Sequence, residues 1–166
     1  MSTESFLIVQ EHRGLITPCT QAIFMNEHPQ YQTKVKDSRD DRHLAARHLD
    51  ILNEACMERG ASYKGKKEAV VRYLHMYHKV PIVIDPIFGI VTFPTVSPKR
   101  FDCMWIFPLN VLDYEPRDSN EVLVTFKDHS TLIVPVSYKV FKNQMERAAM
   151  CLQHFAYRPG GNKHSG

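Results

Sequence analysis

The segment "GASYKGKK", residues 60–67, has residue types and a spacing that could bind phosphate. Gly60, Gly65 and Lys66 stand where a nucleotide-binding loop carries its two glycines and its lysine. Such a loop follows a strand, opens a helix and ends in a Ser or Thr whose hydroxyl binds magnesium. Here Lys67 takes that last position, where its ammonium group would repel the cation. Because the segment also follows an expected helix, we do not interpret it as a nucleotide site.

The same stretch could instead contact the phosphates of a nucleic acid. Its cations are Lys64, Lys66 and Lys67, and Arg72 follows shortly after it. Ser62 and Tyr63 beside them can donate hydrogen bonds, and contacts of this kind supply much of the affinity of proteins for nucleic acids. The alternative is a solvated basic turn after a helix, where cations complement the helix dipole. The residues alone leave both interpretations open.

A second candidate is "VSPKRFDCMW", residues 96–105, which we expect to form a loop between strands. Lys99 and Arg100 lie between Pro98 and Phe101. A cation in a narrow minor groove with an apolar wedge beside it is one known way to bind and bend DNA. The alternative is an exposed loop anchored by aromatic side chains, and we expect both Phe101 and Trp105 to lie in the core.

The histidines and cysteines do not form a recognisable catalytic or metal-binding set. His75 and His78 are three residues apart, but no Cys or acidic partner lies close to them in the sequence. The cysteines are scattered, without a Cys-x-x-Cys pair, and we expect four reduced thiols, most of them buried: Cys19, Cys56, Cys103 and Cys151. We therefore expect no cofactor, no metal and no enzymatic activity.

The totals describe one ordinary globular domain. The chain has 166 residues, 43% of them hydrophobic and 23% charged, with a net charge of +3. Residues 61–112 hold 7 Lys+Arg against 3 Asp+Glu, whereas residues 1–60 hold 7 against 9, so the positive charge lies in the middle third. No apolar run could cross a bilayer and the first residues do not resemble a signal peptide, which predicts an intracellular protein without a membrane partner.

Hydrophobic spacing predicts an α+β fold, with antiparallel sheets or hairpins and two main helices packed on them. The helices are expected at residues 39–59, with a capping box from Ser38 to Asp41, and at residues 137–155, with Ser137 as N-cap. Hairpins are expected in residues 5–25, 81–94 and 121–137, while "KEAVVRYLHMYH" fits either a helix or a strand. Residues 1–157 would form the single domain, and residues 158–166 a disordered polar tail.

Several segments together resemble the ComK family of competence transcription factors: "SYKGKK", "HKVPIVIDP", "FPTVSPKRFDCMWI", "VTFKDHSTLIVPVSY" and "FKNQMERAA". They occur in the family's order and cover roughly residues 56 to 150. The resemblance implies a non-enzymatic, cytoplasmic and nucleoid-associated activator that binds A/T-rich boxes through the minor groove, as a dimer or higher oligomer. It also implies control of DNA-uptake genes, and delivery by an adaptor protein to a Clp protease. Lys67 and Arg100 occupy basic positions of the family's motifs.

The resemblance leaves two functions open. Family members usually continue past the last helix with an extension for adaptor recognition and activation, whereas this chain ends soon after "HFAYRPGG". It could therefore be a paralogue that binds DNA without activating. The alternative is a protein-interaction paralogue that does not bind DNA and associates with a regulator or a Clp-protease adaptor.

Overall fold

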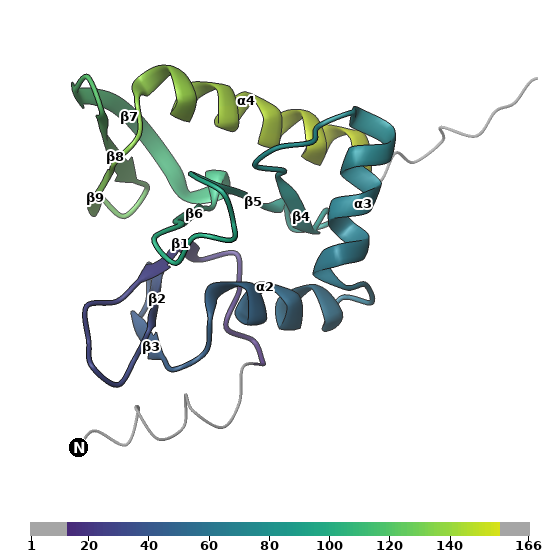
Figure 1. Cartoon of the computed structure of the whole chain (residues 1–166), viewed down its shortest axis with the longest axis horizontal. Coiled ribbons are helices and arrows are strands. Elements are labelled where there is room, and N and C mark those ends of the chain that lie inside the picture. Colours follow the sequence, from purple (N-terminus) through teal and green to yellow (C-terminus); the bar gives the residue numbers. More distant parts are fainter. Residues whose placement is uncertain (1–12, 157–166) are drawn as a thin grey trace, which may run out of the picture.

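The structure of the chain is a computed structural model that describes residues 13–156, so the expected tail at 158–166 lies outside the described residues. It is a mixed α+β body, which confirms the expected fold class (Figure 1). A six-stranded antiparallel sheet has the order β3-β2-β1-β6-β5-β4, and a three-stranded antiparallel sheet has the order β7-β8-β9. Within residues 13–156, three α-helices pack around them, and the one beyond the two main helices expected covers most of the segment "KEAVVRYLHMYH", which fitted either a helix or a strand.

The strands and helices follow one another along the chain with short connections. The strands of the larger sheet are β1 (Thr20–Met25), β2 (Thr33–Asp37), β3 (Arg42–Leu44), β4 (Ile82–Asp85), β5 (Ile90–Pro94) and β6 (Trp105–Ile106). Those of the smaller sheet are β7 (Val111–Asp118), β8 (Glu121–Phe126) and β9 (Thr131–Val134). The helices are α2 (His48–Met57), α3 (Tyr63–Leu74), α4 (Tyr138–Phe155) and the short 3₁₀ helix η1 (Pro108–Asn110).

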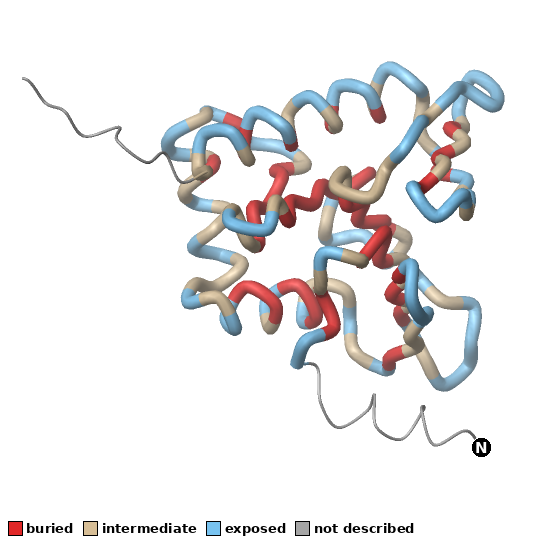
Figure 2. Tube along the Cα trace, turned by 180° about the vertical axis from the view of Figure 1, so that it is seen from behind, coloured by how far each residue is buried: buried red, intermediate tan, exposed pale blue. Residues whose placement is uncertain are grey.

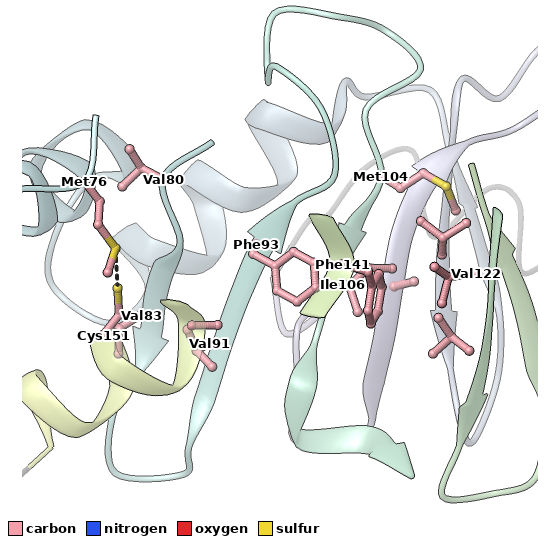
Figure 3. Packing of buried hydrophobic residues seen from close by; sticks show 14 of the residues in the cluster. Met76, Val80, Val83, Val91, Phe93, Met104, Ile106, Val122, Phe141 and Cys151 are labelled. Carbon is pink, nitrogen blue, oxygen red and sulfur yellow. Dashed lines mark hydrogen bonds between the residues drawn. The ribbon is translucent and has the colours of Figure 1, made fainter. Parts of the chain in front are cut away.

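Both faces of the larger sheet are buried, because alternate side chains of its central strands enter two different cores. In β5, Phe93 packs with Phe141 of α4, their rings meeting edge-on at 5.4 Å, and Figure 3 shows this contact. Ile90 of the same strand belongs to the other core, with Ile51 of α2 and Trp105 of β6. Buried residues therefore run through the middle of the molecule, with helices on both sides (Figures 1 and 2).

Helix α3 lies at the β4 end of the larger sheet and runs from the level of α2 to the level of α4 (Figure 1). Val70 is its only fully buried residue. Most of its length is therefore open to solvent on one side. The smaller sheet lies toward the opposite end of the molecule (Figure 1).

Several expectations about individual elements are confirmed. Helix α4 begins after Ser137, whose hydroxyl accepts a hydrogen bond from Val140 N at 3.2 Å, and it ends at Phe155. The β8–β9 hairpin forms around residues 127–130, and β9 is an edge strand, which is compatible with Pro135 directly after it because proline cannot donate a backbone hydrogen bond. The expected hairpin at residues 81–94 forms from β4 and β5, and Asp85 at the end of β4 accepts the Ile87 and Phe88 N–H groups of the turn.

The helix expected at residues 39–59 is wrong over its first nine residues. Residues 42–44 form β3 instead, because Arg42 pairs with Val35 of β2 and Leu44 buries its side chain in the core. Asp41 does not cap a helix; its carboxylate binds Lys34 Nζ at 3.3 Å and accepts the Asp37 N–H. The first strand of the expected opening hairpin lies in residues outside the description, and β1 pairs with β2 and β6.

Candidate nucleic-acid interface

The segment "GASYKGKK" contains the end of the turn that follows α2 and the first residues of helix α3. Ser62 has extended backbone angles, and its Oγ accepts the Gly65 N–H at 3.0 Å, so it caps the helix. Asn53 of α2 accepts the Tyr63 N–H at 3.0 Å and satisfies a second free donor of the first turn. A Cβ on Gly65 would lie 3.2 Å from Ser62 Oγ, so glycine leaves room for this cap.

Helix α3 separates its four cations into two groups. Lys64, Lys67 and Arg72 line one shallow hollow of about 280 Å³, together with Glu68 and Val71. Lys66 lines a different hollow, against Val83 of β4 and Phe155 of α4. The structure therefore brings three of the four residues together and turns the fourth toward the α4 side of the helix.

The grouped cations of α3 form no ion pair with a carboxylate in the part of the chain that the structure describes. Among residues 13–156, none of the ion pairs includes Lys64, Lys67 or Arg72. The Arg72 guanidinium makes a cation–π contact with its neighbour Tyr73, at 5.7 Å from the centre of the ring. Their charges are thus available to an anionic partner.

Lys99 and Arg100 lie in an exposed turn between β5 and β6, as expected. The turn closes through a hydrogen bond from Arg100 N to Ser97 O at 3.0 Å. Arg100 donates from Nε and Nη2 to both carboxylate oxygens of Asp102, at 2.9 and 2.7 Å. This guanidinium holds the pKa of Asp102 below its ordinary value. Lys99 has no such partner among the ion pairs of residues 13–156, so it is the unpaired cation of the turn.

The expectation that both aromatic residues of this segment lie in the core is right for one and wrong for the other. Trp105 is fully buried, whereas Phe101 is 73% exposed at the surface of the turn. The difference follows from position: Trp105 belongs to β6 in the centre of the sheet, and Phe101 precedes the strand. An apolar side chain therefore stands in solvent beside two cations.

The buried indole of Trp105 connects the turn to helix α3. Its Nε1 donates to His48 Nδ1 at 3.0 Å, and His48 Nε2 donates in turn to the Arg100 carbonyl at 3.2 Å. The Tyr63 ring, at the start of α3, meets the indole edge-on at 6.1 Å. Burial lowers the pKa of His48 and raises the pKa of Tyr63 to about 12, so both rings stay neutral around the indole. Both cationic segments are thus anchored on one buried side chain.

The sequence analysis missed Arg47. This exposed residue precedes α2 and lines a hollow of about 580 Å³ with Lys99 and Phe101. Its side chain makes no capping bond and forms none of the ion pairs of residues 13–156. The net charge of residues 1–60 gave no indication of Arg47, because this segment carries more acidic than basic residues. No local signal would have paired it with Lys99, 52 positions away.

Acidic residues gather elsewhere. Asp113, Glu115 and Asp118 lie on β7, in the smaller sheet. Figure 1 shows that sheet at the opposite end of the molecule from α3. Arg117 also lies on β7, and Lys127, Lys139 and Lys142 are exposed near that sheet and on α4, so charges of both signs occur at that end.

Other kinds of site have little support in the described part of the chain. Residues 13–156 hold no group of three His, Cys, Asp or Glu side chains placed to bind a metal ion. His75 and His78 are both exposed, as expected of surface histidines. Cys56, Cys103 and Cys151 are buried, Cys19 is half-buried, and all four are unpaired. None of the helices described is long and apolar enough to cross a membrane.

Comparison with known proteins gives a family match along most of the chain. A sequence model of the family described as ComK protein matches residues 10–159. A relative from Bacillus subtilis (strain 168), named competence transcription factor, is 34% identical over 110 residues. That alignment covers 66% of this chain and 57% of the relative, so the chain spans little more than half of the relative's length. No solved structure matches.

Proposed function

Since the chain belongs to the ComK family, we propose that it is a transcription regulator that binds double-stranded A/T-rich DNA and controls genes of competence and DNA uptake. The name of the Bacillus subtilis relative, competence transcription factor, supports this role. The observation that carries the proposal is the unpaired group Lys64, Lys67 and Arg72 on the open side of α3. We call these three residues the α3 cations.

The α3 cations suit contacts to the DNA backbone. Each Lys or Arg that neutralises a phosphate releases condensed counterions, and this release supplies a large part of the affinity of proteins for DNA. The turn with Lys99 and Arg100 would act beside them, because both segments pack on Trp105. Cations of this kind are attracted to the narrow minor groove of A/T tracts, where negative potential is concentrated.

Lys66 is the fourth cation of the segment, and we expect it to contribute less. It faces the hollow next to Val83 and Phe155, away from the α3 cations. A duplex seated on the α3 cations would lie on the other side of the helix. Lys66 remains one of the residues proposed to contact DNA, and we predict that its substitution weakens binding less than substitution of Lys67.

The test is a charge-matched pair of triple variants. Lys64→Ala/Lys67→Ala/Arg72→Ala removes the α3 cations, while Lys127→Ala/Lys139→Ala/Lys142→Ala removes three exposed lysines near the smaller sheet and on α4. Binding to a duplex with A/T boxes and to a scrambled duplex of equal composition is measured by fluorescence anisotropy between 50 and 200 mM salt. At about 0.9 units of slope per phosphate contact, the first variant should lose about 2.7 units from the slope of log K against log salt. The second should keep nearly the wild-type slope.

Two results would contradict the proposal. Equal salt slopes for both triple variants would mean that the α3 cations contribute no more to DNA binding than the three control lysines do. Failure of the wild-type chain to bind the A/T duplex would favour the alternative, a protein-interaction paralogue that associates with a regulator or a Clp-protease adaptor. Lys66→Ala, measured alongside, should change the slope less than Lys67→Ala.

The proposal includes self-association on DNA. One chain groups three cations on α3, so a single box would be held weakly, whereas pairing on tandem boxes raises the effective concentration of the second chain. Analytical ultracentrifugation with one-box and two-box duplexes measures this directly. We expect two chains or more on the two-box duplex, with cooperative loading.

A further inference from the structure

The turn between β5 and β6 holds an aromatic ring out into solvent. Phe101 is 73% exposed, although a phenylalanine gains free energy by leaving water. Its neighbours are Lys99 and Arg100 before it and Asp102 after it. Arg47 lines the adjoining hollow of about 580 Å³ together with Lys99 and Phe101, and Asp50 lines it as well. Packing in the fold gives no reason for a phenylalanine at this position.

The backbone on both sides of Phe101 is held by hydrogen bonds. The Arg100 carbonyl accepts from Cys103 N at 3.3 Å and from His48 Nε2 at 3.2 Å. Arg100 N donates to Ser97 O at 3.0 Å. Cys103 is fully buried, and its Sγ contacts the Val96 carbonyl at 3.5 Å. The ring is therefore presented by a fixed turn that rests on the core, which reduces the entropy lost when a partner takes it up.

We propose that Phe101 is a wedge that enters between adjacent base pairs from the minor groove and kinks the duplex. An inserted apolar side chain that partly unstacks a base step, with basic groups on the flanking backbone, is a known way to bend DNA. Phe101 supplies the apolar tip, while Lys99 and Arg47 lie where they can meet the phosphates of the two flanking strands. This inference rests on the proposed function and adds to it a deformation of the DNA at a defined residue.

A second exposed phenylalanine in the same molecule provides the control. Phe88 is 63% exposed in the turn between β4 and β5. No Lys or Arg lies within residues 84–91, and the cation beside this turn, Arg59, is held by Asp85 at 3.1 Å. Phe88→Ala therefore removes the same group from a site without the features of a wedge.

The experiment uses the full chain and an A/T-box duplex that carries 2-aminopurine at successive steps. Unstacking raises 2-aminopurine fluorescence, and energy transfer between dyes at the two ends reports the bend. Wild type and Phe101→Leu should raise the fluorescence and bend the duplex, because leucine also serves as a wedge. Phe101→Ala should lose both signals and bind on the order of tenfold more weakly, in line with the loss of an aromatic contact to bases. Thermal melting checks that each variant folds, as expected for an exposed side chain.

The outcomes distinguish this inference from the function on which it rests. If Phe101→Ala unstacks and bends the duplex as wild type does, Phe101 is not a wedge, while DNA binding stands. If Phe88→Ala lowers both signals as much as Phe101→Ala, the effect is not specific to this turn and the inference is likewise overturned. If the wild-type chain does not bind the A/T duplex, the proposed function fails and the wedge fails with it.

Discussion

The carboxylate of Asp102 restrains the only arginine of the exposed turn, and removing its charge should strengthen DNA binding. Arg100 donates to it through two hydrogen bonds, at 2.9 and 2.7 Å, so its guanidinium is already satisfied in the free protein. The two side chains are 59% and 40% exposed. Because exposed ion pairs contribute little to folding free energy, Asp102→Asn should leave the fold intact.

The expected gain follows from counting charges. In Asp102→Asn, Arg100 is free to contact one phosphate, which adds about 0.9 units to the salt slope of binding. Between 50 and 200 mM salt, a slope change of about 0.9 corresponds to a factor of about 3.5 in relative affinity. The variant should therefore bind the A/T duplex more tightly than wild type at 50 mM salt, and this advantage should shrink about 3.5-fold by 200 mM.

Fluorescence anisotropy at four salt concentrations measures this slope, and two further variants complete a cycle. Arg100→Ala should lower the affinity slightly, and Asp102→Asn in the Arg100→Ala background should add little. Glu68→Gln removes a carboxylate beside the α3 cations and serves as a charge-matched comparison. The reasoning is refuted if Asp102→Asn has the wild-type slope, or if its gain is equally large without Arg100.

Two further predictions concern the supports of the interface. Ser62→Ala removes the hydroxyl that accepts the Gly65 N–H and should lower the free energy of unfolding by about 1 kcal/mol. Ser62→Asp should not lower it, because aspartate can also cap a helix. Urea denaturation measures both variants, and equal losses would contradict the role of the cap. For His48, burial lowers the pKa from its ordinary value of 6.5, and Nδ1 must stay unprotonated to accept the Trp105 N–H. The unfolded chain thus binds the proton more readily, so the stability due to the neutral ring is complete above pH 6.5 and is lost as the pH falls through and below that value. His48→Gln should flatten the dependence of unfolding free energy on pH below 6.5, and an unchanged pH profile would exclude His48 as its source.

Much of the fold could be predicted because its signals are local. Helix α4 has its N-cap, Ser137, and its apolar stripe within one continuous segment, and the β8–β9 hairpin has its turn within four residues. Residues 39–47 misled the prediction, because Leu44 fits a helical spacing while its actual partner is a strand. Pairing with β2 is a contact between segments, so no pattern within residues 39–47 could announce it.

Some features of the candidate site could likewise be predicted from the sequence, and others could not. The six basic residues proposed to contact DNA are visible in the sequence, but the side of the molecule on which each lies is not. Lys66 and Lys67 are adjacent in the chain and line different hollows. The helical start at Ser62 decides this, since successive residues of a helix point about 100° apart. The exposure of Phe101 was predicted wrongly, because the apolar character that suits a core suits an exposed binding tip equally well.

By itself, the sequence determined the fold class, the family and the region of the chain that carries excess positive charge. These depend on composition, periodicity and the order of motifs, all of which are properties of the linear chain. Only the tertiary structure decided which cations act together, that Arg100 is paired with Asp102, and that Arg47 lies across a hollow from Lys99. Charge interactions depend on distance through space, and the packing of α2, α3 and the turn around Trp105 sets those distances.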